Sequence, residues 1–436
     1  MADRERRLGI LAGGGKLPRE IAESAARQGL PVKIVAIDSE ADKDLTGFDV
    51  SRVNWGGIGA MIRELKDARV TDLVIVGRVH RPELGALRPD LGFFRHLPRL
   101  LKIVASGGDD SVLRRVIRFF EGHGFRVIGP GEAAPELLVR EGAAGTARPA
   151  PRDDADIRRG LELIRVLGPF DVGQGVVIAD GRIEAIEGVE GTDRMIARAA
   201  ERRARDGGGI AGRGGVLVKR SKPEQDLRVD MPAIGPATVD GVETAGLSGI
   251  AVEADKALIA ERAIALARAD AAGVFIAGVR DNGQNSTRPQ RDRKSSAIEL
   301  IALGGVKPKD HAVVDAAKGL RTVAALAPFD AGATAVVVRS HVLAVEAGEG
   351  AEDTVRRARG LRQWASLTRQ RRGVVVLRRA AALTPALVTI VANGGYAGLA
   401  VSDDGAAVPA DALAAAEREG VFVAFGSSGE EVPQTS

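Results

Sequence analysis

The chain has 436 residues, of which 45% are hydrophobic, and it contains no cysteine. This length can bury several cores, while the lack of cysteine excludes disulfides and thiolate metal sites. A net charge of +4 and an aromatic content of 3% disfavour nucleic-acid binding, because few rings are left for base stacking. No stretch reaches the roughly 18 apolar residues of a membrane span, and the first residues lack the pattern of a secretory signal.

The first 38 residues follow the pattern strand, glycine loop, helix, strand. Apolar residues Leu8–Ala12 and Val32–Ile37 predict two buried strands, and Gly13–Gly15 directly follow the first of them. Backbone amides exposed at a helix start after such a loop bind phosphate, so we expect a nucleotide or phosphate here. Pro18 stands where the dinucleotide fingerprint has its third glycine. Asp38, at the end of the second strand, nevertheless leaves a nicotinamide cofactor as an alternative.

Alternating strands and helices extend this pattern to about residue 130. Asp72–Val76 is a predicted strand that ends in Gly77-Arg78, and ligands of open α/β sheets bind at such strand ends. Asp109-Asp110 precede the predicted helix Val112–Glu121, and these aspartates are either helix caps or part of a site. The alternation predicts a parallel, doubly wound sheet.

A strongly polar segment follows another predicted strand, Val216–Val218. Its residues Asp226, Arg228 and Asp230 alternate with apolar ones, so in an extended backbone all three would share one face. Two carboxylates beside several cations can hold a divalent metal against a phosphate. The alternative is a solvated strand face whose charges pair with one another.

The C-terminal part of the chain repeats the middle part. Asp156–Ala199 and Asp315–Ala358 align without a gap at a constant offset of 159 residues, which predicts a third domain that is a copy of the second. The copy keeps strand and turn residues but lacks counterparts of Asp226 and Asp230, and it also replaces Thr192-Asp193. A carboxylate pair needed only for folding should persist in such a copy. Its loss therefore indicates chemistry in the second domain.

The predicted architecture is α/β throughout. We expect a Rossmann-like nucleotide-binding domain (1–135), a second, catalytic α/β domain (150–280), a polar linker (281–308), a degenerate repeat of the second domain (309–428) and a flexible tail (429–436).

The first 280 or so residues resemble the LpxI-type UDP-2,3-diacylglucosamine diphosphatases of lipid A synthesis. The resemblance rests on the order and spacing of LAGGGKLP (11–18), GR (77–78), RPD (88–90), GDD (108–110), DVGQGVV (171–177), EGTD (190–193), VLVKRSKPEQDLRVDMPAIGPAT (216–238) and AGLSGIAVEADKALI (245–259). It implies Mg²⁺-dependent hydrolysis of UDP-2,3-diacylglucosamine to 2,3-diacylglucosamine 1-phosphate (lipid X) and UMP. The N-terminal domain would then hold the nucleotide, and the second domain the acylated sugar. The third domain departs from the family pattern.

The resemblance also implies where the site lies in this sequence. The expected nucleotide-binding residues are Ala12, Gly13, Gly14, Gly15, Leu17, Gly77, Arg78, Asp109 and Asp110. The expected catalytic residues are Asp226, Asp230, Lys219, Lys222, Arg228, Thr192 and Asp193. Of these, Asp226 and Asp230 would hold Mg²⁺, and the cations would stabilise developing charge.

Enzymes of this family act in the cytoplasm at the inner face of the inner membrane, so the resemblance implies a peripheral membrane protein. A homodimer is left open, and no nucleic-acid partner is expected. Two other functions compete with hydrolysis. One is an NAD-dependent oxidoreductase, suggested by the glycine loop, and the other is a non-catalytic regulator of lipid A synthesis, suggested by the extra copy.

Overall fold

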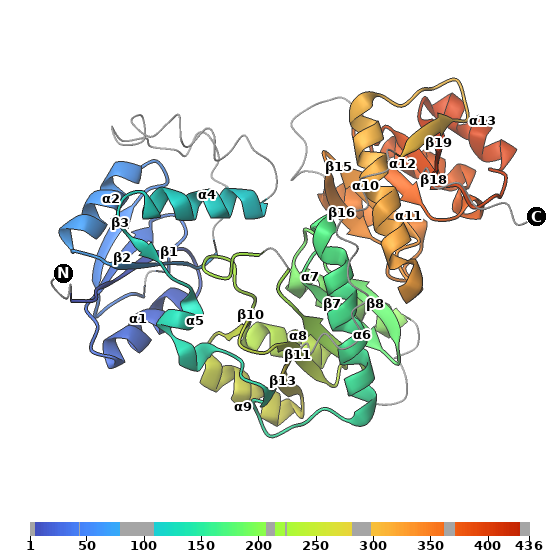
Figure 1. Ribbon diagram of the computed structural model, residues 1–436. Helices are drawn as coiled ribbons and strands as arrows, with labels where there is room; N and C mark the ends of the chain where they lie inside the picture. The colour runs from blue at the N-terminus through green and yellow to red at the C-terminus, as the bar shows by residue number, and fades with distance from the viewer. Residues whose placement is uncertain are drawn as a thin grey trace, which may run out of the picture. The chain divides into compact units, whose positions relative to one another are not determined.

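The computed structural model (Figure 1) describes residues 5–42, 44–78, 109–205, 214–222, 225–280, 298–361 and 371–427. These residues form sheets of five, five and six strands and one two-stranded pair. Helices and strands alternate along the chain, which confirms the predicted α/β class. The chain divides into two compact units, which are described separately. The first contains 1–148, 224–240 and 252–280, and the second contains 149–223, 241–251 and 281–436.

The first unit is built on a five-stranded sheet in which all strands are parallel. Its order is β3-β2-β1-β4-β5, and this order confirms the predicted doubly wound domain. The direction of winding reverses between β1 and β4, and open α/β sheets bind ligands at such a switch point. The strands are β1 (Leu8–Ala12), β2 (Val32–Ile37), β3 (Asp49–Val53), β4 (Asp72–Val76) and β5 (Arg126–Val127).

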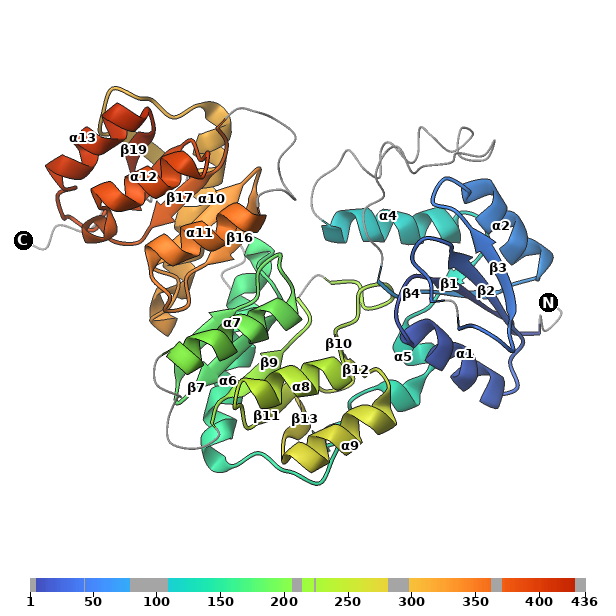
Figure 2. The same ribbon diagram turned by 180° about the vertical axis from the view of Figure 1, so that it is seen from behind.

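Helices cover both faces of this sheet (Figure 2). Residues of α1 and α5 share a core with Ile10, whereas residues of α2 and α4 share a second core with Leu11. Successive side chains of a strand point to opposite faces, which is why these two neighbours belong to different cores. The helices are α1 (Leu17–Arg27), α2 (Ile58–Asp67), α4 (Asp109–Glu121) and α5 (Pro130–Ala133).

Later segments of the chain complete the first unit and lead into the second sheet. They are η2 (Pro135–Leu137), β6 (Gly142–Ala143), β10 (Ala233–Ile234), α8 (Pro236–Thr244), β12 (Leu258–Ile259), α9 (Arg262–Ala272) and β13 (Phe275–Val279). Strands β10 and β12 form a parallel pair.

The second sheet has the order β13-β11-β9-β7-β8. Strand β7 runs antiparallel to both β8 and β9. Its further elements are α6 (Pro151–Leu167), η3 (Gly168–Phe170), β7 (Gly175–Ala179), β8 (Arg182–Ile186), α7 (Thr192–Arg205), β9 (Val216–Lys219) and β11 (Gly249–Glu253).

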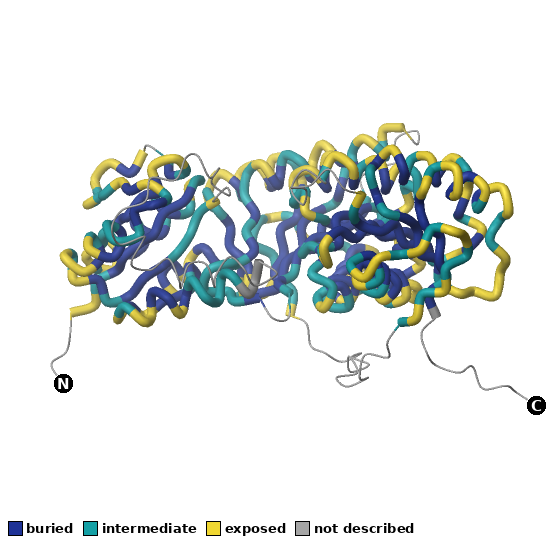
Figure 3. Tube along the Cα trace, turned by 90° about the horizontal axis from the view of Figure 1, so that it is seen from above, coloured by how far each residue is buried: buried dark blue, intermediate teal, exposed yellow. Residues whose placement is uncertain are grey.

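The third sheet repeats this order and adds one strand. It runs β14-β19-β18-β17-β15-β16, so its last five strands correspond in place to β13, β11, β9, β7 and β8. Figure 3 shows buried stretches of the chain in the interior and exposed residues mostly at outer turns. The elements are β14 (Glu299–Ala302), α10 (Asp310–Leu326), η4 (Ala327–Phe329), β15 (Thr334–Val338), β16 (His341–Val345), α11 (Ala351–Leu361), β17 (Val374–Leu377), η6 (Ala380–Ala382), α12 (Pro385–Asn393), β18 (Gly398–Ser402), α13 (Ala410–Glu419) and β19 (Phe422–Ser427).

A buried aspartate makes the same contacts in the second domain and in the third domain. The carboxylate of Asp156 on α6 accepts hydrogen bonds from the turn amides of Asp180 (3.0 Å) and Gly181 (2.7 Å). Its equivalent, Asp315 on α10, accepts from the turn amides 159 residues further on, at 3.1 and 2.6 Å. Burial raises the pKa of both carboxyl groups. The sequence alignment of the two domains therefore holds down to single hydrogen bonds.

One domain boundary differs from the prediction. Strand β14 lies inside the predicted linker 281–308 and pairs antiparallel with β19, so the linker prediction is wrong over that stretch. The strand was missed because Glu299–Ala302 is short and follows a strongly polar run. The tail 429–436 and the motif at 88–90 lie outside the described residues.

Candidate active site

Two predicted glycine turns lie side by side in the N-terminal domain. Strands β1 and β4 are parallel neighbours, so Gly13–Gly15 and Gly77-Arg78 meet at the carboxyl end of the sheet, at the switch point. Gly14 and Arg78 exchange two backbone hydrogen bonds, of 2.7 and 2.8 Å. Ala12 ends β1 and Leu17 begins α1. These predicted nucleotide-binding residues are therefore gathered in one place.

The amides of the first turn all donate within the chain. Gly13 donates to the carbonyl of Val76, the last residue of β4, at 2.9 Å, and Gly14 donates to that of Arg78 at 2.7 Å. Gly15 donates to the carboxylate of Asp42 at 3.3 Å. In this conformation, the amides are not the exposed phosphate donors that the sequence suggested. Lys16 pairs with Asp42 at 3.2 Å. The hydrogen bonds from Lys16 and Gly15 lower the pKa of Asp42.

The other two predicted nucleotide-binding residues, Asp109 and Asp110, form the first turn of α4. The helix therefore begins three residues before its predicted start, and the aspartates lie inside it rather than ahead of it. Their side chains are outside the described part of the structure.

Gly77 is constrained by both conformation and space. Its φ is +104°, and a Cβ atom there would lie 2.7 Å from the carbonyl carbon of Gly13. We expect Gly77→Ala to lower the free energy of unfolding by about 3 kcal/mol, because it combines left-handed strain with a backbone clash. Gly29→Ala is the matched control, since its φ is +74° but no atom lies within 4 Å. It should cost only about 1 kcal/mol. Equal losses in urea unfolding would show that the contact with Gly13 is unimportant.

The acidic segment forms a turn rather than a strand. The amides of Val229 and Asp230 both donate to the carbonyl of Asp226 at 3.1 Å, so these residues form one helical turn. The prediction that Asp226, Arg228 and Asp230 lie along one extended face is therefore wrong, because local hydrogen bonds to Asp226 replace strand pairing. A spacing of four residues in a helical turn still places the two carboxylates on the same side.

Arg228 holds the carboxylate of Asp226 in this conformation. Its Nε and Nη2 atoms donate to the two carboxylate oxygens at 2.9 and 2.7 Å, and Nη1 donates to Glu121 at the end of α4 at 3.0 Å. The hydrogen bonds from Arg228 lower the pKa of Asp226. Asp230 accepts a hydrogen bond from Gln225. Asp226 is therefore an ionised carboxylate that is paired with the guanidinium of Arg228 in this conformation.

This turn lies at the carboxyl end of the N-terminal sheet. A Cβ on Gly129, just after β5, would be 3.3 Å from the carbonyl oxygen of Leu227. Val229 packs on the core under α2 and α4, while Met231 packs on the core under α1 and α5. Since those cores lie on opposite faces, the segment crosses the end of the sheet. The glycine turns lie at the same end, because all five strands are parallel. A cavity of about 330 Å³ opens beside Asp226.

A buried chain of hydrogen bonds forms in the second unit, at the end of β9. Lys219 Nζ donates to Thr192 Oγ1 (2.9 Å), and Thr192 donates to Glu187 Oε1 (3.1 Å). Glu187 Oε2 accepts from the amide of Gln174 at 3.3 Å. Lys219 and Glu187 are only 5% and 6% exposed. Gly175 leaves room for this carboxylate, because a Cβ there would lie 2.6 Å from Oε2.

The second unit holds two further predicted site residues, Lys222 and Asp193, which differ from each other in their surroundings. Lys222 forms an ion pair with Asp171, whereas Asp193 is exposed in the first turn of α7. Glu187 was not among the predicted site residues. The sequence carried a signal for it, because Glu187 recurs in the repeat as Glu346.

The third domain keeps this carboxylate but not its partners. Ala351 and Leu377 stand where the second domain has Thr192 and Lys219. Burial raises the pKa of Glu346. The third domain therefore folds without the Thr192 hydroxyl and the Lys219 ammonium group. This indicates that the second domain keeps these two groups for a reason other than folding.

Within the described ranges, no three His, Asp or Glu side chains gather as a ready-made metal site. None of the helices in this part of the chain has the length and apolar character needed to cross a membrane.

Comparison with known proteins decides the family. The LpxI N-terminal domain family matches residues 7–137, and the LpxI C-terminal domain family matches residues 140–277 and 301–382. The chain belongs to the LpxI family. It is 38% identical over 274 residues to the UDP-2,3-diacylglucosamine pyrophosphatase LpxI of Caulobacter vibrioides, an alignment that covers 63% of this chain and 98% of that relative. The LpxI resemblance seen in the motifs is thus confirmed.

Proposed function

We propose that this chain hydrolyses the diphosphate of UDP-2,3-diacylglucosamine, giving 2,3-diacylglucosamine 1-phosphate and UMP. The observation that carries this proposal is the alignment with 98% of a relative named for that activity. Both LpxI domains are matched. The matched regions contain the two glycine turns, the acidic turn at Asp226–Asp230, and the hydrogen-bonded chain from Lys219 through Thr192 to Glu187.

We propose Mg²⁺ as the cofactor, with Asp226 and Asp230 as its ligands. Mg²⁺ commonly takes only one or two protein carboxylates and completes its shell with waters and substrate phosphates. Two carboxylates on one helical turn fit this donor set, and Arg228 already keeps the pKa of Asp226 low. When bound, the ion would offset the charge of the diphosphate and activate a water molecule.

The chain's own residues supply positive charge and positioning. Arg228 can release Asp226 and turn its guanidinium to a phosphate, since Arg–carboxylate and Arg–phosphate pairs use the same planar geometry. Lys219 and Lys222 bring ammonium groups, and Thr192 and Glu187 fix the position of Lys219. Near the glycine turns, Lys16 and Arg78 would bind the nucleotide phosphate.

We also propose that the third domain arose by duplication of the second. Five strands share one order, and Asp315 repeats the hydrogen bonds of Asp156. Without counterparts of Asp226, Asp230 and Lys219, the copy would not catalyse the reaction. Because the substrate carries two acyl chains, we place the enzyme peripherally at the membrane surface, and we place it in the cytoplasm because the family resemblance implies that location.

Metal removal and ligand binding test these proposals together. The purified chain should release UMP from UDP-2,3-diacylglucosamine in Mg²⁺, and EDTA should stop the release until Mg²⁺ is restored. In equilibrium dialysis it should bind UMP and not NAD. Binding of NAD without UMP would favour an oxidoreductase, and UMP binding without turnover would favour a regulator.

A further inference from the structure

Within the second unit, helix α6 of the second domain packs against helix α10 of the third domain. Helix α6 lies beside the 3₁₀ turn η4 of the third domain, and α10 lies beside the 3₁₀ turn η3 of the second domain. Arg159 on α6 donates to the carbonyl of Phe329 at 2.8 Å, and its guanidinium lies 5.5 Å from the centre of that ring. The residue equivalent to Arg159 on α10 is Lys318, which lies 159 residues later in the chain. The pKa of Lys318 is lowered by burial and is raised in part by the charge of Asp171, which follows Phe170, the equivalent of Phe329.

A network of four partly buried charges joins the loops that follow β8 and β16. Arg357 on α11 donates to Glu349 of its own domain at 2.6 Å and to Glu190 of the second domain at 3.4 Å. Glu190 also pairs with Arg198 on α7. Arg198 is the equivalent of Arg357, and Glu190 is the equivalent of Glu349. The four side chains are between 4% and 19% exposed. Each domain therefore brings the same acid and the same arginine to one network.

The two edge strands meet the two loops in the same reciprocal way. A Cβ on Gly188 would lie 2.8 Å from the carbonyl oxygen of Leu343 on β16. The equivalents of these residues are Ala347 and Glu184. Their carbonyl oxygens both accept from Arg202 Nη1 at 3.3 Å. The loop of each domain thus faces the edge strand of the other.

Reciprocal contacts, in which residue i meets j and the equivalent of j meets the equivalent of i, define a two-fold interface. We propose that this face of the second domain is self-complementary and that the third domain occupies it within the same chain. The chain is an internal pseudo-dimer of the LpxI C-terminal domain. The partner that the face fits is therefore another copy of that domain, and the intact chain is a monomer.

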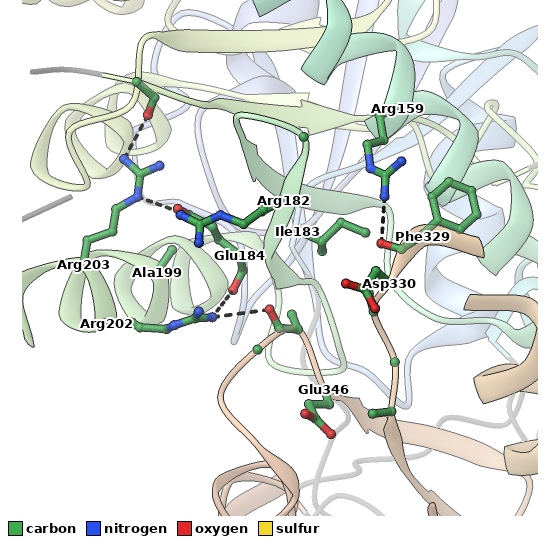
Figure 4. A pocket seen from close by; sticks show the side chains of 17 residues that line it. Arg159, Arg182, Ile183, Glu184, Ala199, Arg202, Arg203, Phe329, Asp330 and Glu346 are labelled. Carbon is green, nitrogen blue, oxygen red and sulfur yellow. Dashed lines mark hydrogen bonds and ion pairs between the residues drawn. The ribbon is translucent and has the colours of Figure 1, made fainter. Parts of the chain in front are cut away.

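One departure from two-fold symmetry has a visible cause. A cavity of about 600 Å³ separates the domains on the side of Arg202 (Figure 4). Its walls include Arg159 from the second domain and Asp330 and Glu346 from the third. Arg202 inserts its guanidinium between Glu184 and Ala347, whereas its equivalent in the third domain is Leu361. On the opposite side, Gly188 lies against β16.

Cleavage of the full chain tests this proposal. A protease site is inserted between residues 288 and 289, and the cut protein is analysed by size exclusion with light scattering. Without substitutions, the two pieces should elute together at the mass of the intact chain. Arg357→Glu places a third acid beside Glu190 and Glu349, and it should weaken the association on the order of a hundredfold. The released N-terminal piece, whose own face is unchanged, should then elute as a dimer.

Arg356→Glu is the matched control, because Arg356 is 54% exposed and pairs with two acids on its own helix. Its pieces should stay together. Arg159→Glu provides a second route that leaves the third domain unsubstituted, and it should also separate the pieces. The proposal is overturned if the unsubstituted pieces separate on cleavage, if Arg159→Glu behaves like the Arg356 control, or if the N-terminal piece released by Arg357→Glu stays monomeric.

Discussion

Replacing Asp226 with asparagine should reduce kcat/KM for UDP-2,3-diacylglucosamine hydrolysis by about a thousandfold or more. Asparagine keeps the size of the side chain and can still accept hydrogen bonds from Arg228, so the turn should form. It cannot supply the negative charge that binds a divalent cation. Initial rates across a Mg²⁺ titration should show the loss, and higher Mg²⁺ should recover only part of it.

Asp240→Asn is the matched control for this experiment. Asp240 is a half-exposed carboxylate in the same unit, and its ion pair is with Arg268. The control should retain full activity. A variant of Asp226 that keeps more than about a tenth of the wild-type rate would show that this carboxylate is not a metal ligand.

Replacing Lys219 with methionine should affect both activity and stability. We expect turnover to fall about a hundredfold, because a cation that stabilises developing charge is lost. The free energy of unfolding should fall by about 3 kcal/mol, because the buried chain from Lys219 through Thr192 to Glu187 loses the positive charge that offsets the carboxylate. Adding Glu187→Gln to Lys219→Met should restore stability without restoring activity. Recovery of turnover in the double variant would mean that Lys219 serves the fold alone.

Glu346→Gln in the third domain is the matched control for Glu187. Burial raises the pKa of Glu346, so folding favours its neutral form. Its contribution to stability is greatest at low pH and is lost as pH rises through its folded-state pKa. At neutral pH, removing this charge should therefore leave stability unchanged or slightly higher, and urea unfolding would detect a loss if the charge were needed.

Much of the N-terminal domain follows directly from the sequence. Strands β1, β2 and β4 have the predicted boundaries, since each is an apolar run with glycine or polar residues at its end. Strand β3 was not predicted, because Asp49–Val53 has polar residues and only its last residue is buried. An edge strand with this composition is recognised by its pairing with β2, which the sequence does not show.

The acidic turn could not be predicted from local pattern. Alternation of Asp226, Arg228 and Asp230 with apolar residues suits a strand, but it equally suits a turn whose apolar residues pack on the sheet end. The contacts of Val229 and Met231 with two separate cores decide between them. Glu187 could not be assigned from local pattern either, because the hydrogen-bonded chain through Thr192 ends at Lys219, which is distant in sequence. The repeat was visible from the sequence, whereas the reciprocal contacts between its copies required the folded structure.

We propose that this chain cleaves the diphosphate of a uridine-linked diacylated sugar. The most direct measurement follows the reaction of the purified full chain with UDP-2,3-diacylglucosamine and Mg²⁺ by ³¹P NMR. The paired diphosphate signals should disappear while two monophosphate signals, those of UMP and 2,3-diacylglucosamine 1-phosphate, grow in equal amounts. Unchanged diphosphate signals, or the appearance of UDP in place of UMP, would contradict the claim.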